Sequence, residues 1–273
     1  MLSVGLVLLV AATLVSLTVG QGLVGIDEAY RALVAPDLTD DAHITVRSVR
    51  LPRAVLAILV GAALALSGAL IQTLTRNPLA EPGLLGVTAG ASFAVVVVTR
   101  FFGASGQTVT LLVAFLGAAA AAFAVQGVGR SEPVKLLLAG VALTAVLAGF
   151  SIAIRLTSPD TFDNYRFWAV GSLAGREQLP LLLPCLVLVL ALIAALALGR
   201  SLGAISLGDD VAHGLGVSVT RTRTLALVVA TVLAATATAV AGPIMFVGLI
   251  VPHLVRRFAR ASISWLMWLC LVM

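Results

Sequence analysis

Two adjacent carboxylates, Asp209 and Asp210, lie in a polar stretch of an otherwise apolar chain, SLGAISLGDDVAHGLGVSVTRTR. Around them Leu207, Val211 and Leu215 recur every four residues, so a short helix here has one apolar edge. The two acids fall in the first turn of that helix, where the helix dipole stabilises negative charge. An apolar edge beside two carboxylates is suited to contact with another protein. The alternative is an ordinary amphipathic helix within a loop.

Three arginines, Arg47, Arg50 and Arg53, lie immediately before a long apolar run. A spacing of three residues places them on one side of a helical turn, which predicts a single cationic surface. One interpretation is that this surface binds a partner protein. The other is interfacial anchoring, in which arginine side chains extend to lipid headgroups.

The sequence contains no catalytic or metal-binding motif. No G-x-x-x-x-G-K-[ST], H-E-x-x-H or G-x-S-x-G segment occurs, so ATPase and hydrolase activities have no support. The two cysteines and three histidines lack ligand spacing, and we predict no metal and no cofactor. No clear apolar run carries the acids or histidines that a proton-coupled carrier needs. If ATP drives this protein, a separate subunit must hydrolyse it.

The elements that position these residues are predicted to be membrane-spanning helices. Hydrophobic residues make up 60% of the 273 residues and charged residues 11%, with a mean hydropathy of +1.13. Soluble domains carry roughly a quarter charged residues. This composition indicates an integral membrane protein. In such a protein the net charge of +5 indicates cytoplasmic arginines, not nucleic-acid binding. Eight spans and part of a ninth are predicted at 2–20, 54–75, 83–99, 108–128, 136–154, 179–198, 224–242, 243–255 and 261–273.

Two features suggest how the spans are arranged. The second apolar run breaks at Arg76-Asn77-Pro78 and restarts through a Pro/Gly-rich turn, which predicts a tight hairpin. Segments 63–80 and 235–254 also share a glycine followed by a proline ten residues later. These residues are Gly68 and Pro78 in one segment, and Gly242 and Pro252 in the other. The segments begin an odd number of spans apart, so they are expected to run in opposite directions, as in an inverted repeat.

Several separated motifs give the chain a family resemblance. They read RLPR, SGALIQ, NPLAEPGLLG, WAVGSL and PIMFVGLIVPHLVR, in that order. In this wording the chain resembles the FecCD-type permease subunits of ABC importers for iron–siderophores, haem and vitamin B12. The resemblance implies an all-α inverted-repeat transmembrane bundle, with ten spans in the intact family, in the inner (cytoplasmic) membrane. It also implies four partners: an ABC ATPase subunit, an extracytoplasmic substrate-binding protein, a second permease chain and membrane lipid.

The same resemblance suggests roles for the candidate residues. The segment that docks onto the ATPase would comprise Leu207, Asp209, Asp210, Val211, Ala212, Leu215 and Gly216. The surface for the binding protein would comprise Arg50 and Arg53, which match the RLPR motif, with Arg47 added by extension. The gate and pathway would include Asn77, Pro78, Leu79, Trp168, Gly171 and Ser172. A rigid hairpin at 77–79 and an interfacial anchor at Trp168 are the alternatives without transport.

The resemblance ends near residue 260. We therefore expect an incomplete permease domain at 1–260 and an aberrant apolar tail, ASISWLMWLCLVM, at 261–273. At 1.5 Å per residue this tail covers about 20 Å, too short for a bilayer core of about 30 Å. The chain is thus interpreted as an importer permease for an iron chelate. The alternatives are a secondary carrier or channel, and a truncated fragment that transports nothing.

Overall fold

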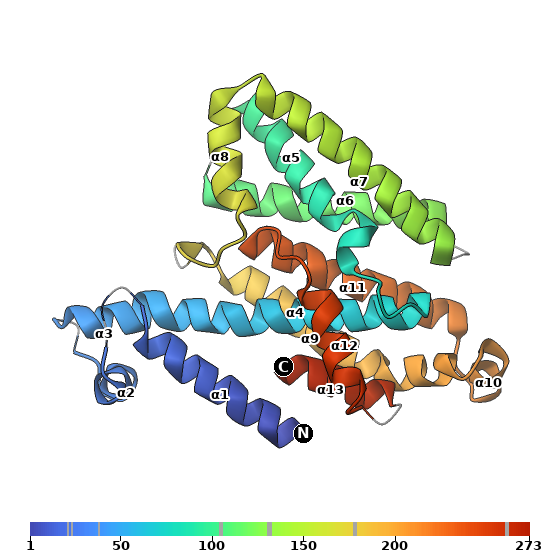
Figure 1. Ribbon diagram of the computed structural model, residues 1–273, viewed down its shortest axis with the longest axis horizontal. Coiled ribbons are helices and arrows are strands. Elements are labelled where there is room, and N and C mark those ends of the chain that lie inside the picture. The colour runs from blue at the N-terminus through green and yellow to red at the C-terminus, as the bar shows by residue number, and fades with distance from the viewer. Residues whose placement is uncertain are drawn as a thin grey trace.

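The computed structural model describes residues 1–20, 22, 24–37, 39–103, 106–129, 133–176, 179–259 and 262–273 (Figure 1). All regular secondary structure within these residues is helical, which confirms the all-α prediction. The first helices are α1 (Leu2–Thr18), α2 (Ile26–Val34), α3 (Asp41–Thr45), the π-helical turn η1 (Val46–Arg50) and α4 (Leu51–Thr75). The 3-10 turn η2 (Pro82–Leu85), α5 (Val87–Phe102), α6 (Gln107–Gly129), α7 (Pro133–Leu156) and α8 (Pro159–Ala169) follow. The last are α9 (Leu182–Ser206), α10 (Asp209–Gly214), α11 (Val219–Ala241), α12 (Val247–Arg256) and α13 (Ile263–Val272).

Each predicted apolar run contains a helix, but the helices differ in length. Among the described residues, five helices are long and apolar enough to cross a membrane: Asp41–Thr75, Gln107–Val128, Val134–Leu156, Leu182–Ser206 and Val219–Ala241. Four apolar helices in the described residues are shorter, namely α1, α5, α12 and α13. Helix α12, predicted as a full span, has 10 residues and covers about 15 Å, half the thickness of the hydrocarbon core.

Helix α4 lies at the centre of the bundle and packs against α9, α11, α12 and α13 (Figure 1). Small residues bring the helix backbones together. A Cβ atom added at Gly68 would overlap the carbonyl oxygen of Gly248 on α12. Leu66, Leu70 and Ile71 are fully buried around this crossing. The main hydrophobic core of the protein is built on this helix.

Helices α5, α6 and α7 form a second group, with α8 across one end (Figure 1). Gly90 on α5 and Gly117 on α6 face each other, and a Cβ atom at either would overlap the carbonyl oxygen of the other. Helix α7 packs on α5 and α6 but presents most of its surface outward. Only 11% of its apolar window is buried, so in a membrane this surface contacts lipid or another chain.

Helices α4 and α11 run antiparallel, as predicted for an inverted repeat (Figure 1). The predicted pairing of glycines and prolines, however, does not mark equivalent positions. Gly68 lies within α4, whereas Gly242 follows the end of α11. Pro78 lies in a turn, whereas Pro252 lies inside α12. The shared spacing therefore joins residues whose backbone conformations differ.

The backbone itself shows a different correspondence. Arg76 and Gly242 each end a long helix with a positive φ, of 51° and 78°. Gly86 and Phe246 then begin α5 and α12 in the left-handed conformation, with φ of 75° and 70°. Each half therefore has a long helix, a break and a left-handed residue that starts the next helix. The repeat is therefore seen in the backbone conformations, whereas the spacing of glycine and proline in the sequence did not locate it.

The last described residues, 262–273, form part of the bundle. Helix α13 packs against α1, α4, α9 and α12. Its side chains Leu266, Met267, Leu269 and Cys270 are buried in the main core. The predicted boundary between residues 260 and 261 lies outside the described residues, and α13 itself packs like the other helices.

Candidate functional site

The candidate residues gather at two opposite ends of the bundle (Figure 1). One end, here the α10 end, consists of residues 76–79 and 207–223. The other, here the α8 end, consists of residues 46–53 and 168–176. Helix α4 runs from the α8 end to the α10 end, so a single buried helix connects the two groups (Figure 1).

The three residues of the predicted apolar edge are exposed at the α10 end, although only Val211 lies within α10 itself. Leu207, Val211 and Leu215 are 69%, 46% and 64% exposed, whereas Ala212 between them is fully buried. Helix α10 is only six residues long and begins after Gly208, whose φ is 120°. Gly216, with φ of 76°, follows its end. The two glycines allow the chain to leave α9 and to turn back toward α11, which holds this edge on the outside.

Asp209 and Asp210 have different environments. An oxygen of the Asp209 carboxylate lies 2.9 Å from an Arg223 nitrogen and 3.6 Å from an Arg76 nitrogen. Arg76 ends α4 and Arg223 lies in the first turns of α11, so Asp209 connects α10 to both long helices. Asp210 is exposed. One acid therefore fixes the segment, and the other lies on the surface beside the apolar edge.

The turn at 76–79 lies at the same end. Arg76 takes the left-handed conformation and also donates to the Ile205 carbonyl oxygen at 3.4 Å. The Asn77 side-chain oxygen accepts the Leu79 N–H at 2.9 Å, which fixes the turn around Pro78. Leu79 is 69% exposed. The structure thus brings together two segments that the sequence analysis considered separately.

A buried polar network holds α4 against α12. Gln72 is 2% exposed, and its amide nitrogen donates to the carbonyl oxygens of Gly248 and Leu249, at 3.3 Å in both cases. Its side-chain oxygen accepts from Arg256 at 3.0 Å. A Glu81 carboxylate oxygen accepts the Phe246 N–H at 2.8 Å, at the start of α12. Sequence reasoning missed these roles, although a glutamine inside an apolar run was an available signal.

At the α8 end, the three arginines do not form one surface. Arg50 is 2% exposed, and its guanidinium donates to the carbonyl oxygens of Leu17, Thr18 and Gly22 at 2.7–2.9 Å. It therefore satisfies carbonyls at the end of α1, where a positive charge also favours the helix dipole. Arg47 is exposed and Arg53 is half-buried. The predicted docking surface is thus reduced to Arg47 and Arg53.

The 168–172 segment packs closely against the turn after α11. A Cβ atom at Gly171, which has a φ of 70°, would lie 2.6 Å from the Pro243 carbonyl oxygen. Trp168 is 3% exposed, so it is not an interfacial anchor in this fold. The Ser172 hydroxyl oxygen accepts the Ala174 N–H at 3.1 Å.

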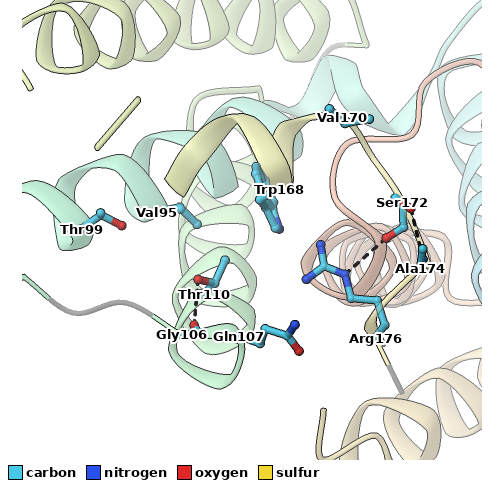
Figure 2. A pocket seen from close by; sticks show the side chains of 10 residues that line it. All are labelled: Val95, Thr99, Gly106, Gln107, Thr110, Trp168, Val170, Ser172, Ala174 and Arg176. Carbon is cyan, nitrogen blue, oxygen red and sulfur yellow. Dashed lines mark hydrogen bonds between the residues drawn. The ribbon is translucent and has the colours of Figure 1, made fainter. Parts of the chain in front are cut away.

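A cavity of about 490 Å³ lies beside this segment, and no sequence pattern had indicated it (Figure 2). Its walls come from α5, the start of α6 and the loop after α8. Trp168 and Ser172 line it together with Arg176. Of the residues that the structure describes, no three of the types His, Cys, Asp and Glu lie close enough to hold a metal ion.

A helical bundle of this kind, with five described helices long and apolar enough to cross a membrane, is that of a multi-pass membrane protein. Comparison with known proteins makes that class specific. Residues 8–273 match the FecCD transport family, to which this chain belongs. It is a permease subunit of the ABC importer class, in which ATP hydrolysis is carried out by a separate subunit. This confirms the resemblance found in the sequence.

Two relatives and one solved structure illustrate the match. The ferric enterobactin transport system permease protein FepD of Escherichia coli K12 is 44% identical over 265 residues, covering 95% of this chain and 79% of the relative. The iron(3+)-hydroxamate import system permease protein FhuB of Bacillus subtilis is 35% identical over 267 residues, covering 96% and 69%. An inward-facing metal-chelate type ABC transporter superposes with a TM-score of 0.86 at 29% identity, covering 99% of this chain and 85% of that one.

Proposed function

We propose that this chain forms the membrane path of an importer for an iron chelate, with the α10 end in the cytoplasm. The observation that carries the proposal is the exposed edge of Leu207, Val211 and Leu215 beside Asp210. Three large apolar side chains on and beside a six-residue helix, at the polar end of a membrane bundle, are suited to a protein groove. The names of the two relatives, which refer to ferric enterobactin and iron(3+)-hydroxamate, support a chelate as the substrate.

The ion pairs of Asp209 suggest how ATP hydrolysis acts on the path. A force on α10 reaches the end of α4 through Arg76 and the start of α11 through Arg223. Arg76 is also the first residue of the turn that contains Asn77, Pro78 and Leu79. We infer that these three residues form the cytoplasmic gate and that Asp209 positions the gate relative to α10.

The α8 end would then face outward in the inner membrane. Arg47 and Arg53 are available there for carboxylates of an extracytoplasmic binding protein. Trp168, Gly171 and Ser172 would form the outer part of the path. The outward-facing surface of α7 is apolar and suits lipid or a second permease chain, identical or different.

The docking edge can be tested by replacing Val211 and Leu215 with aspartate in one variant. Co-purification of the ATPase subunit should be lost, because two charges would enter an apolar groove. Leu156→Asp is the matched control, since Leu156 is 81% exposed at the other end of the bundle and should leave co-purification unchanged. If the double variant retains its ATPase, the assignment of this edge is wrong.

A second variant, Asp209→Asn, distinguishes binding of the ATPase from coupling between α10 and the gate. It should keep the ATPase bound, yet reduce ATP-driven uptake of a ferric chelate into proteoliposomes several-fold, because both ion pairs of Asp209 are lost. Asp27→Asn, at an exposed acid of α2 outside the docking segment, is its control for charge. Uptake driven by an ion gradient in the absence of ATP would instead favour a secondary carrier.

A further inference from the structure

The cavity at the α8 end is lined by hydrogen-bond donors. Its polar residues come from three elements: Thr99 on α5, Gln107 and Thr110 on α6, and Ser172 and Arg176 in the loop after α8. The described lining includes one arginine and no acid. Its volume of about 490 Å³ is in the range of small-molecule sites, roughly 300–1,000 Å³. The space is larger than a single carboxylate side chain from a partner protein would need.

Trp168 forms part of the cavity wall. The side chain is 3% exposed, and its indole Nε1, which is closed off from solvent, has no acceptor among the described residues. In Figure 2 the indole extends from α8 toward the space enclosed by Thr110, Gln107 and Arg176. The ring therefore shapes the cavity, and the polar contacts to a ligand come from the other lining side chains.

The position of Trp168 is fixed by its neighbours. Tyr165, one turn earlier on α8, lies with its ring centroid 6.1 Å from that of Trp168. Its hydroxyl is 3.3 Å from the Ser92 hydroxyl on α5. The Arg155 guanidinium lies over the Tyr165 ring, 4.2 Å from its centroid. The Trp168 indole therefore belongs to a preorganised wall, which lowers the entropic cost of binding.

Arg176 supplies the positive charge. Its Nε donates to the Ser172 carbonyl oxygen at 3.3 Å, and its terminal nitrogens have no partner among the described residues. Figure 2 shows the guanidinium extending from the loop toward Thr110 and Gln107 across the cavity. Burial lowers the pKa of Arg176, because removal of water disfavours the charged form. The group remains charged at neutral pH, and a nearby anion would offset its loss of solvent.

We propose that this cavity binds an anionic oxygen-bearing arm of the metal chelate, such as a carboxylate or catecholate, as the chelate enters the membrane path. Arg176 makes the charged contact, the Gln107 amide donates to the same arm, and the Trp168 ring forms the adjoining wall. The proposal rests on the proposed function, because it takes the chelate as the substrate. It assigns specificity to the permease itself, at a site separate from the gate at Asn77, Pro78 and Leu79.

The test is equilibrium binding of ⁵⁵Fe-labelled ferric enterobactin, and separately of ferric citrate, to the permease–ATPase complex in nanodiscs without binding protein. Arg176→Gln should weaken binding at least about 10-fold, through loss of a hydrogen bond to a charged group. Arg176→Lys keeps the charge without the planar fork and should have a smaller effect. Trp168→Phe keeps an aromatic ring in the wall and should weaken binding less than Arg176→Gln does.

Arg100→Gln is the matched control. Arg100 is an exposed arginine near the end of α5 and does not line the cavity, so its loss should leave affinity unchanged. Co-purification of the ATPase with every variant confirms that the permease is folded. Unchanged chelate affinity in Arg176→Gln would overturn the proposal.

Two further outcomes distinguish a chelate site from a lipid headgroup site, and failure of this proposal from failure of the proposed function. Nanodiscs with and without phosphatidylglycerol distinguish a chelate site from a lipid headgroup site. If Arg176→Gln changes only the retention of phosphatidylglycerol, the chelate site is wrong. If the unaltered complex imports no ferric chelate at all, the proposed function fails and the cavity proposal fails with it. Import by the unaltered complex together with unchanged binding by Arg176→Gln overturns the cavity proposal alone.

Discussion

Helices α4 and α7 are both long and apolar, yet they occupy opposite environments. In α4, 72% of the apolar window is buried, whereas in α7 the share is 11%. Helix α4 contacts helices on several sides and α7 mainly contacts α5 and α6. The two spans have similar hydropathy but different positions: α4 is the central axis of the bundle, and α7 is an outer wall.

The difference lies in polar side chains, because both helices have a glycine at a backbone contact. Gly68 of α4 meets the Gly248 carbonyl oxygen, and Gly140 of α7 meets the Leu84 carbonyl oxygen. Ser67 and Gln72 of α4 also donate to carbonyls of other helices at 2.7–3.3 Å. In α7 the buried hydroxyl of Thr144 has no partner in the described residues, and Gly149 has nothing within 4 Å of an added Cβ atom. Without a hydrophobic driving force between helices in lipid, hydrogen bonds between helices favour α4 as the central span.

The largest expected effect is that of Gly68→Leu. The new side chain must displace the α12 backbone at Gly248, so unfolding free energy should fall by more than about 4 kcal/mol. The measurement is denaturant-induced unfolding of the purified protein in detergent. Gly149→Leu is the matched control on α7 and should change stability by less than about 0.5 kcal/mol. A large loss with Gly149→Leu would show that another chain covers α7.

An intermediate effect is expected from leucine truncation. Leu70→Ala removes a fully buried side chain from α4 and should destabilise the protein by about 2–5 kcal/mol, through lost burial and the cavity it leaves. Leu138→Ala removes a side chain of α7 that is 65% exposed and should cost less than about 1 kcal/mol. Equal losses in the same unfolding assay would contradict the assignment of α4 as the axis.

The smallest expected effect concerns polar groups. Gln72→Leu removes the partner of Arg256 and two donors to α12 carbonyls, and should cost about 1–3 kcal/mol. Thr144→Val replaces a buried hydroxyl that lacks a partner, so it should be neutral or slightly stabilising. Thermal unfolding of both variants in one detergent gives the comparison. A cost for Thr144→Val would reveal a partner for that hydroxyl.

Sequence periodicity predicted the local features well. Leu207, Val211 and Leu215 are all exposed, although α10 includes only Val211, because Gly208 with a φ of 120° interrupts the helix that the four-residue spacing predicted. The apolar runs located the helices because length and hydropathy are local properties of the chain. The break at Arg76 was also visible, since proline and asparagine terminate helices locally.

Long-range contacts could not be predicted in the same way. Arg47, Arg50 and Arg53 are the same residue type at equal spacing, but only Arg50 meets the carbonyl end of α1. The cavity beside Trp168 combines residues from 95 to 176, which no single pattern connects. Such differences depend on which helix ends meet in space, and local periodicity contains no information about that.

The hydrogen bonds of α4 also set the order of events during biosynthesis. Ser67 and Gln72 find their partners in residues 163 to 177 positions further along the chain. At roughly 5–20 residues per second, a ribosome needs on the order of 10–30 s to make that length. For that interval the newly inserted axis has polar side chains without their final partners. Water, the insertion machinery or a chaperone must satisfy them until α11 and α12 arrive, so the centre of this permease is among the first parts inserted and the last completed.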